Sequence, residues 1–295
     1  MCGIVGLHLR DPELYPHLGR MLESMLCEVI ERGPDSAGVA VYGDVRRCPE
    51  GWAAVSVLGA TSGLVDELSL SGLPEVLSTD AGDTTVLAAP VALDDLVASV
   101  RAAAPEALIV GSGTDLTVYK GIGHPRELAR TYDLAHAQGW QGLAHTRMAT
   151  ESAVTPQGCH PFSVGPDQCL VHNGSFANHA TIRRELVAEG VRFDSENDSE
   201  VGARYVASRL AQGEDLEKAL RMLCERFDGF YTLLVTSKNG FAVVRDAIAC
   251  KPAIIAETPQ WVAMASEFRA LAGLPGIDGA RLYEPEPGRV YAWTR

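Results

Sequence analysis

Apolar residues near the start of the chain predict a strand, a helix and a second strand. Residues 3–9 are almost continuously apolar, which is typical of a short buried strand. Residues 18–29 carry apolar side chains at helical spacing, and Gly33-Pro34 then ends the helix. Residues 39–42 follow as the next strand. This order predicts a loop between the helix and the second strand, and it places Cys2 at the tip of the first strand.

A segment with elements of its own follows at residues 45–115. Its apolar pattern predicts a strand at 84–89, a helix at 93–103 and a strand at 107–110. Asp94 and Asp95 lie in the first helical turn, where the positive end of the helix dipole favours carboxylates. The alternative is an elaborated surface loop, but disordered loops seldom carry such apolar strands. We therefore expect a small β-α-β-like insertion.

The rest of the chain mixes helices with short strands. A helix is predicted at 126–138, and a strand at 142–145 follows it. Further helices are predicted at 180–189, 199–211 and 216–225, and short strands at 230–235, 241–244, 253–255, 261–264 and 289–293. Runs of strands around runs of helices predict an α+β fold.

Charge and cysteine usage exclude several classes of protein. Acidic residues outnumber basic ones 38 to 25 among the 295 residues, and the net charge of −13 argues against a nucleic-acid partner. No apolar run approaches the roughly 20 residues of a membrane span. A polar segment at 10–13 follows too closely on residue 2 for a signal peptide. The seven cysteines show no C-x-x-C spacing, so we expect reduced thiols, a cytoplasmic location and no metal site.

Cys2 is the first candidate for chemistry. Removal of Met1 would leave one residue that carries both a thiol and a free α-amine. An N-terminal amine that takes the proton of its own residue's side chain is a recognised way to activate a nucleophile. The competing interpretation is a buried structural cysteine, which is common. Cys2 alone does not decide between the two.

Further motifs follow Cys2 in a fixed order. They are Arg32-Gly33-Pro34-Asp35-Ser36-Ala37-Gly38, His145-Thr146-Arg147-Met148-Ala149-Thr150, His172-Asn173-Gly174 and Asn197-Asp198-Ser199-Glu200. Together they resemble the class II glutamine amidotransferases, which are N-terminal-nucleophile hydrolases that release ammonia from glutamine. The resemblance implies a four-layer αββα sandwich. It also implies a class II amidotransferase domain over residues 2–295, with residues 45–115 inserted in it.

The resemblance assigns a role to each motif. Cys2 would be the nucleophile, and Asn173 and Gly174 the oxyanion hole, although a bare Asn-Gly pair is more often a hairpin turn. Arg147 suits the α-carboxylate of the substrate because its planar guanidinium can donate two parallel hydrogen bonds.

The resemblance places Asp198 at the substrate's ammonium group, and a helix N-cap is an additional role compatible with that one. Arg32 and Gly33 would line the nucleophile, and Thr150 and His160 would add secondary substrate contacts. His145, His160 and His172 are more typical of structural histidines, because the terminal amine already serves as the base. Met148 departs from the aromatic residue that the family often carries after the arginine.

Ammonia released into water would be protonated and lost as a nucleophile, so members of this family usually pass it to a synthase domain. No such domain follows before Arg295. We therefore expect a glutaminase subunit that takes L-glutamine and supplies a partner. The resemblance is to the separate amidotransferase subunit of glutamate-synthase-like complexes, including N-methylglutamate synthase. FMN and iron–sulfur clusters would then belong to partner subunits, with no cofactor in this chain. The alternatives are a silent assembly subunit that retains Met1 and a free-standing glutaminase.

Overall fold

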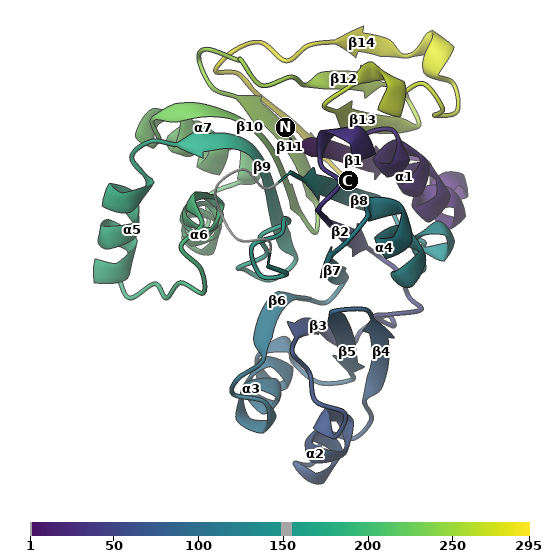
Figure 1. The fold of residues 1–295 in the computed structure, drawn as a ribbon, viewed down its shortest axis with the longest axis vertical. Helices are drawn as coiled ribbons and strands as arrows, with labels where there is room; N and C mark the ends of the chain where they lie inside the picture. The colour runs from purple at the N-terminus through teal and green to yellow at the C-terminus, as the bar shows by residue number, and fades with distance from the viewer. Residues whose placement is uncertain (1, 149–154) are drawn as a thin grey trace.

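The computed structural model describes residues 2–148 and 155–295 (Figure 1). Its largest sheet has the order β14-β12-β13-β1-β8-β2-β7, and each neighbouring pair is antiparallel. In chain order these strands are β1 (Gly3–Leu9), β2 (Ser36–Tyr42), β7 (Leu116–Ile122), β8 (Gln141–Arg147), β12 (Ile254–Glu257), β13 (Trp261–Ala265) and β14 (Arg281–Tyr283). The predicted N-terminal strand is therefore confirmed, and it lies in the middle of this sheet.

A second antiparallel sheet has the order β15-β11-β10-β9. Its strands are β9 (Gln168–Phe176), β10 (Gly229–Ser237), β11 (Gly240–Arg245) and β15 (Val290–Thr294). The two sheets pack face to face through buried side chains such as Ile4 and Leu143 of the first and Val171, Leu234 and Phe241 of the second. This apolar layer forms the centre of the molecule.

Helices cover the outer faces of both sheets (Figure 1). The first sheet packs against α1 (Leu18–Cys27) and α4 (Pro125–Thr131). The second packs against α5 (His179–Ala188), α6 (Asp198–Ala211) and α7 (Leu216–Arg226). Short 3-10 helices lie at Pro12–His17, Ile30–Arg32, Leu134–His136, Phe268–Ala270 and Ile277–Gly279. The layers run helix, sheet, sheet, helix, so the expected αββα sandwich is confirmed.

The predicted helix at 126–138 is wrong in its extent. Helix α4 ends at Thr131, and a separate 3-10 turn follows at Leu134–His136. Between them Asp133 adopts a left-handed conformation with φ 53°, which a continuing right-handed helix does not allow. The apolar spacing on either side conceals this break.

A third sheet stands apart from the sandwich at the bottom of Figure 1. Its order is β4-β5-β3-β6, again with antiparallel neighbours. Its elements in chain order are β3 (Ala53–Leu58), α2 (Leu64–Leu70), β4 (Leu77–Ala81), β5 (Thr84–Ala89), α3 (Leu93–Ala103) and β6 (Leu108–Gly113). This β-α-β-β-α-β order, with β3 between β5 and β6, is the ferredoxin-like topology. We call these residues, 53–113, the inserted unit.

The inserted unit is larger than the β-α-β pattern predicted from sequence. The elements β5, α3 and β6 match that prediction, whereas β3, α2 and β4 were not anticipated. Strand β4 is mostly exposed and polar, so it lacks the apolar run that signals a buried strand. The division of the chain into a domain at 2–295 and an insertion at 45–115 stays a prediction.

The inserted unit is joined to the sandwich through β7. The Ser56 hydroxyl accepts a hydrogen bond from the Val118 amide at 2.9 Å. The Thr84 hydroxyl accepts from the Lys120 amide at 2.9 Å and donates to the Lys120 carbonyl at 3.0 Å. The free edge of the larger sheet is thereby covered, which removes an exposed row of unpaired backbone groups.

Lys120, on β7, is buried at an energetic cost. Its side chain is 2% exposed, and its ammonium lies 4.7 Å from the centre of the Phe162 ring. Burial lowers the pKa of Lys120 from an ordinary 10.5 to about 8. The folded state therefore binds this proton less tightly than the unfolded state does. Below pH 8 the charged form destabilises the fold, and the cost disappears as pH rises from 8 past 10.5.

We therefore expect Lys120→Met to raise the free energy of unfolding at pH 7 by about 3 kcal/mol, since each pKa unit corresponds to roughly 1.4 kcal/mol. Denaturant unfolding at pH 7 and pH 11 measures the effect, and the gain should shrink at the higher pH. Lys218→Met, at a half-exposed position on α7, is the control and should change little at either pH. A loss of stability in Lys120→Met at both pH values would contradict the prediction.

Candidate active site

Cys2 lies at one end of the sandwich, immediately before β1. Strand β1 runs between β13 and β8, and its register pairs Gly3 with Thr146. One step further along the same register, Cys2 comes beside Arg147. The Cys2 carbonyl accepts two hydrogen bonds at 2.9 Å, from Arg32 Nε and from Asn173 Nδ2. Groups from three separate motifs therefore meet at residue 2.

Residues after β13 help to hold the start of β1. The Ile4 amide donates to Ser266 Oγ at 2.9 Å, and the Ser266 amide donates back to the Ile4 carbonyl at 2.9 Å. Glu267 forms an ion pair with Arg32 at 2.9 Å, in which the arginine side chain is 10% exposed. The sequence pattern predicted a strand at 261–264 but gave no role to Ser266 or Glu267. Glu267 and Arg32 are 235 residues apart in the sequence, so no local pattern reveals their contact.

Arg147 and Gly33 are in direct backbone proximity. A Cβ on Gly33 would lie 2.5 Å from the Arg147 carbonyl carbon, so any side chain there would displace the strand end. The Asp35 amide donates to the Arg147 carbonyl at 3.1 Å, and Arg147 Nη1 donates to the Gly158 carbonyl at 3.1 Å. Arg147 is half-buried. The loop at 33–35 thus fixes the backbone from which the Arg147 guanidinium extends.

Asn173 and Gly174 lie within strand β9 and not in a hairpin turn, so the turn alternative is wrong. Asn173 pairs with Thr232 of β10, and its side chain is buried while reaching Cys2. Gly174 has φ 149°, and a Cβ there would lie 2.0 Å from the Phe230 carbonyl oxygen. Only glycine fits this conformation and this spacing.

Asp198 is the first residue of α6 and lies against the end of β9. Its Oδ2 accepts a hydrogen bond from the Phe176 amide at 2.8 Å. The N-cap is Asn197, whose side chain accepts from the Ser199 amide at 2.9 Å, so the N-cap role considered for Asp198 is wrong. The Asp198 side chain is 21% exposed, so its carboxylate is accessible to a ligand.

Three histidines form a buried cluster beside Asp198. The His145 ring lies 4.2 Å from that of His160, centre to centre. The Ser199 hydroxyl joins the other two, at 3.0 Å from His160 Nε2 and 2.8 Å from His172 Nδ1. Burial is the main cause that lowers the pKa of His145 to about 3, that of His172 to about 4 and that of His160 well below 6.5. All three rings are therefore neutral at neutral pH.

The structure brings most, but not all, of the predicted site residues together. Cys2, Arg32, Gly33, Arg147, Asn173 and Gly174 come together as described, whereas Thr150 lies outside the described residues. His160 is 7% exposed and binds Ser199, and a direct contact with substrate stays a prediction. Ser199, Ser266 and Glu267 were not named as site residues in the sequence analysis.

No group of three or more His, Cys, Asp or Glu residues within the described part of the chain is arranged to hold a metal ion. All seven cysteines are free thiols. No described helix has the length and apolarity needed to cross a lipid bilayer.

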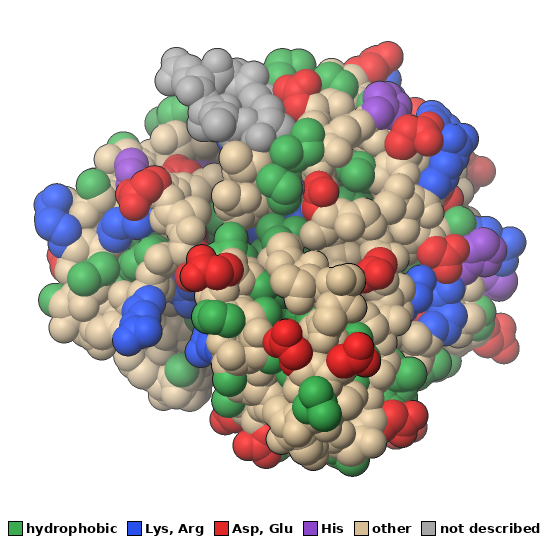
Figure 2. All heavy atoms as spheres, turned by 60° about the horizontal axis from the view of Figure 1, so that its bottom comes forward, with side chains coloured by type: hydrophobic (Ala, Val, Ile, Leu, Met, Phe, Trp, Pro, Cys, Tyr) green, Lys and Arg blue, Asp and Glu red, His purple; other side chains and the backbone are tan. Residues whose placement is uncertain are grey.

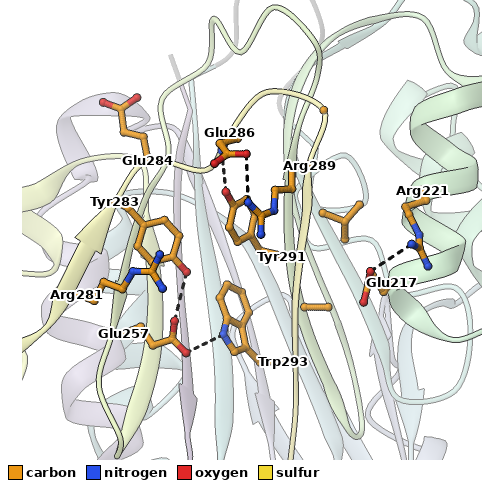
Figure 3. Close-up of a pocket in the computed structure, with 13 residues that line it drawn as sticks. Glu217, Arg221, Glu257, Arg281, Tyr283, Glu284, Glu286, Arg289, Tyr291 and Trp293 are labelled. Carbon is orange, nitrogen blue, oxygen red and sulfur yellow. Dashed lines mark hydrogen bonds and ion pairs between the residues drawn. The ribbon is translucent and has the colours of Figure 1, made fainter.

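Two cavities of more than 700 Å³ lie away from the predicted site residues. One of about 760 Å³ lies between α7, β14 and β15 (Figure 3). Several of its charged groups form ion pairs, with Glu286 bonded to Arg289 at 3.2 Å and Glu217 to Arg221 at 3.6 Å. The other, of about 790 Å³, is lined by residues that include Trp140 and Arg295. None of the residues that line these two cavities is a predicted site residue.

Comparison with known proteins agrees with this geometry. The family described as Glutamine amidotransferase domain matches residues 145–273. The chain is 47% identical to Glutamine amidotransferase-like protein GlxB of Rhizobium meliloti (strain 1021), over 99% of this chain and 98% of that protein. It is also 28% identical to the amidophosphoribosyltransferase of Methanocaldococcus jannaschii, over 62% of this chain and 39% of that protein.

A solved structure shows the same fold. The glutamine phosphoribosylpyrophosphate amidotransferase of B. subtilis matches with a TM-score of 0.59 at 18% identity, over 99% of this chain. This chain spans about half of that protein, 47% of its length. The sandwich and the sequence likeness together define an N-terminal-nucleophile type of amidotransferase. The chain belongs to the glutamine amidotransferase family, as an enzyme of class II.

Proposed function

We propose that this chain is a glutaminase subunit that hydrolyses the γ-amide of L-glutamine through Cys2 and delivers the ammonia to a partner synthase. The observation that carries this proposal is the clamp on residue 2, whose carbonyl is held at 2.9 Å by both Arg32 and Asn173, with Arg147 beside it. This clamp positions the thiol of Cys2 without using it. The thiol is therefore available to a substrate.

The proposed reaction begins once Met1 has been removed. The sulfur of Cys2 attacks the γ-carbonyl carbon, and the α-amine of the same residue takes the thiol proton. Asn173 and Gly174 donate to the developing oxyanion. The amine then gives its proton to the leaving nitrogen, so ammonia departs and a glutamyl thioester remains. Water hydrolyses the thioester to release glutamate and the free thiol.

Two groups would hold the rest of the substrate. Arg147 would bind the α-carboxylate and Asp198 the α-ammonium, because each offers the complementary charge. Arg147 lies at the end of β8, next to residue 2, and Asp198 lies at the start of α6, against β9. One anchor therefore comes from the first sheet and the other from a helix that packs on the second sheet, and Arg147 lies next to the nucleophile.

The partner is proposed to be a glutamate-synthase-like subunit of the N-methylglutamate synthase type, which would carry FMN and iron–sulfur clusters. The sequence resemblance supports this choice. Location in the cytoplasm is proposed with it, since reduced thiols suit that compartment. Purification of the native protein with its associated chains, followed by the mass of its mature N-terminus, tests the proposal. A retained Met1 would favour the silent assembly subunit. Full glutaminase activity without any associated chain would favour the free-standing enzyme.

The inserted unit is the proposed docking face for that partner. Its residues, 53–113, contain eight acidic side chains and one basic side chain, a net charge of −7 out of −13 for the whole chain. Figure 2, in which this unit faces the viewer, shows acidic side chains spread over its surface. On α2, Asp66 and Glu67 are exposed, and Leu70 is 88% exposed. A partner with a basic surface around an apolar pocket would complement this face.

We expect Asp66→Lys with Glu67→Lys to weaken association with the partner by about tenfold or more, because two attractive charges become repulsive. Titration of the purified partner against the variant at two salt concentrations measures this. The control is Glu225→Lys with Asp278→Lys, which makes the same change in net charge at exposed positions outside the unit. Equal weakening in both double variants would show that only net charge matters, and no weakening in either would exclude docking at α2.

A further inference from the structure

Ser199, near the start of α6, lies at the centre of a polar network that includes His172 of β9 and His160. Three atoms surround its hydroxyl: His172 Nδ1 at 2.8 Å, His160 Nε2 at 3.0 Å and Asp198 Oδ1 at 3.4 Å. Ser199 itself is 2% exposed. The hydroxyl therefore has no access to bulk water, and its partners are the groups just named. The Phe176 amide donates to Asp198 Oδ2, and each carboxylate oxygen keeps a second lone pair that a ligand can use.

The number of protons in this network determines which group donates each hydrogen bond. A hydroxyl has one proton and two lone pairs, a neutral imidazole has one N–H, and a carboxylate only accepts. If Ser199 donated to a histidine, Asp198 Oδ1 would face an oxygen lone pair. Every contact is satisfied when both imidazoles donate to the hydroxyl and the hydroxyl donates to Asp198. That arrangement requires the proton on Nε2 of His160 and on Nδ1 of His172.

The opposite ring nitrogens agree with these tautomers. His160 Nδ1 and His172 Nε2 are buried and have no hydrogen-bond partner among the residues that the structure describes. An unpaired lone pair is tolerated better in a protein interior than an unpaired N–H group. The reverse tautomers would bury two N–H groups without acceptors. Burial also lowers the pKa of His160 and of His172, so each ring carries a single N–H at neutral pH.

The network connects the two proposed substrate anchors. His145 precedes Arg147 by two residues on β8, so their side chains lie on the same face of the sheet. The His145 ring packs on His160, and His160 binds Ser199 next to Asp198. The chain of contacts therefore runs from the strand of Arg147 on one sheet to the helix of Asp198 over the other sheet.

We propose that Ser199 is a positioning residue for glutamine recognition: His160 and His172 orient its hydroxyl, which donates to Asp198 Oδ1 and fixes the carboxylate for the substrate's α-ammonium. This inference rests on the proposed function, since it takes Asp198 as the ammonium anchor. Ser199 acts through Asp198 and does not touch the reacting amide. Its loss should therefore affect recognition of the α-ammonium and leave the chemical step largely unchanged.

The test compares L-glutamine with glutaramate, which lacks the α-amino group and keeps the α-carboxylate position and the γ-amide. In Ser199→Ala we expect kcat/KM for glutamine to fall about tenfold, mainly through KM, while kcat/KM for glutaramate stays unchanged. Ser208→Ala is the matched control on the same helix, because its hydroxyl donates to the Tyr205 carbonyl at 2.8 Å and accepts from Arg209 Nε at 3.4 Å, away from Asp198 and the histidines. Both substrates should be hydrolysed normally by that control.

An equal fall for both substrates, or no fall for either, would overturn the positioning role. A wild-type protein that hydrolyses neither substrate would instead contradict the proposed function. The tautomers can be measured independently of any variant, by nitrogen-15 NMR of the histidine rings in the wild-type protein. We expect the Nε2–H form for His160 and the Nδ1–H form for His172, and the reverse forms would overturn the inference even if Ser199→Ala does not fold.

Discussion

Cys2→Ala is expected to abolish glutamine hydrolysis, with a loss of at least about 10⁴-fold, because no other group can form the thioester. The fold should survive. Both hydrogen bonds that hold residue 2 end on its backbone carbonyl, which alanine retains. The measurement is release of glutamate and ammonia by purified protein whose loss of Met1 has been confirmed by mass, together with the thermal unfolding midpoint.

Two variants serve as controls for this prediction. Cys250→Ala removes an exposed free thiol and should leave activity unchanged. Cys2→Ser keeps a nucleophile of nearly the same size but with a much weaker tendency to ionise, so it should also be badly impaired. Glutaminase activity retained in Cys2→Ala would refute the proposed mechanism.

The apolar pattern predicted many strands and helices of the sandwich because these elements bury apolar runs, whereas the four-layer arrangement was implied by the family resemblance. Strand β1 and helix α1 have simple periodic patterns, and the structure confirms both. Strand β14, with three residues that are mainly exposed, and strand β4 gave no such signal. Local pattern predicts an element when the element buries apolar side chains, and it fails when backbone pairing with a neighbour stabilises a polar strand.

The motifs predicted the members of the site, and the structure supplied the groups that hold them in place. Gly33 and Gly174 each lack the space for a Cβ, which explains in physical terms why those positions carry glycine. Ser199 and Glu267 were visible in the sequence, but their contacts join segments that are far apart along the chain. Ser199, for example, meets His160 across 39 residues. Sequence periodicity contains no information about such contacts.

The difference between Asn197 and Asp198 illustrates the same limit. Either residue could cap a helix, since both side chains accept hydrogen bonds from backbone amides. In the structure Asn197 caps α6, and Asp198 instead accepts from the amide at the end of β9. The helix start thus places a carboxylate at the end of a strand in the adjacent layer. Sequence alone could not separate the two roles, because they differ only in tertiary contacts.

Arg147 provides the second large effect. We expect Arg147→Lys to lower kcat/KM for glutamine by roughly ten- to hundredfold and Arg147→Ala by about a thousandfold, mainly through KM. The reason is that a lysine ammonium cannot reproduce the bidentate fork, and each charge-assisted hydrogen bond contributes about 1.5 to 3 kcal/mol. Steady-state kinetics at saturating and limiting glutamine separate the effect on KM from that on kcat.

A substrate analogue makes this prediction specific. Arg147 also donates to the Gly158 carbonyl at 3.1 Å, so its replacement could act by loosening that turn. Hydrolysis of 4-aminobutanamide, which lacks the α-carboxylate, distinguishes the two causes. If Arg147 binds the carboxylate, the variants and the wild type should hydrolyse this analogue at similar rates. A parallel loss on both substrates would assign Arg147 to the fold of the loop, and an unchanged kcat/KM for glutamine would show that the carboxylate is bound elsewhere.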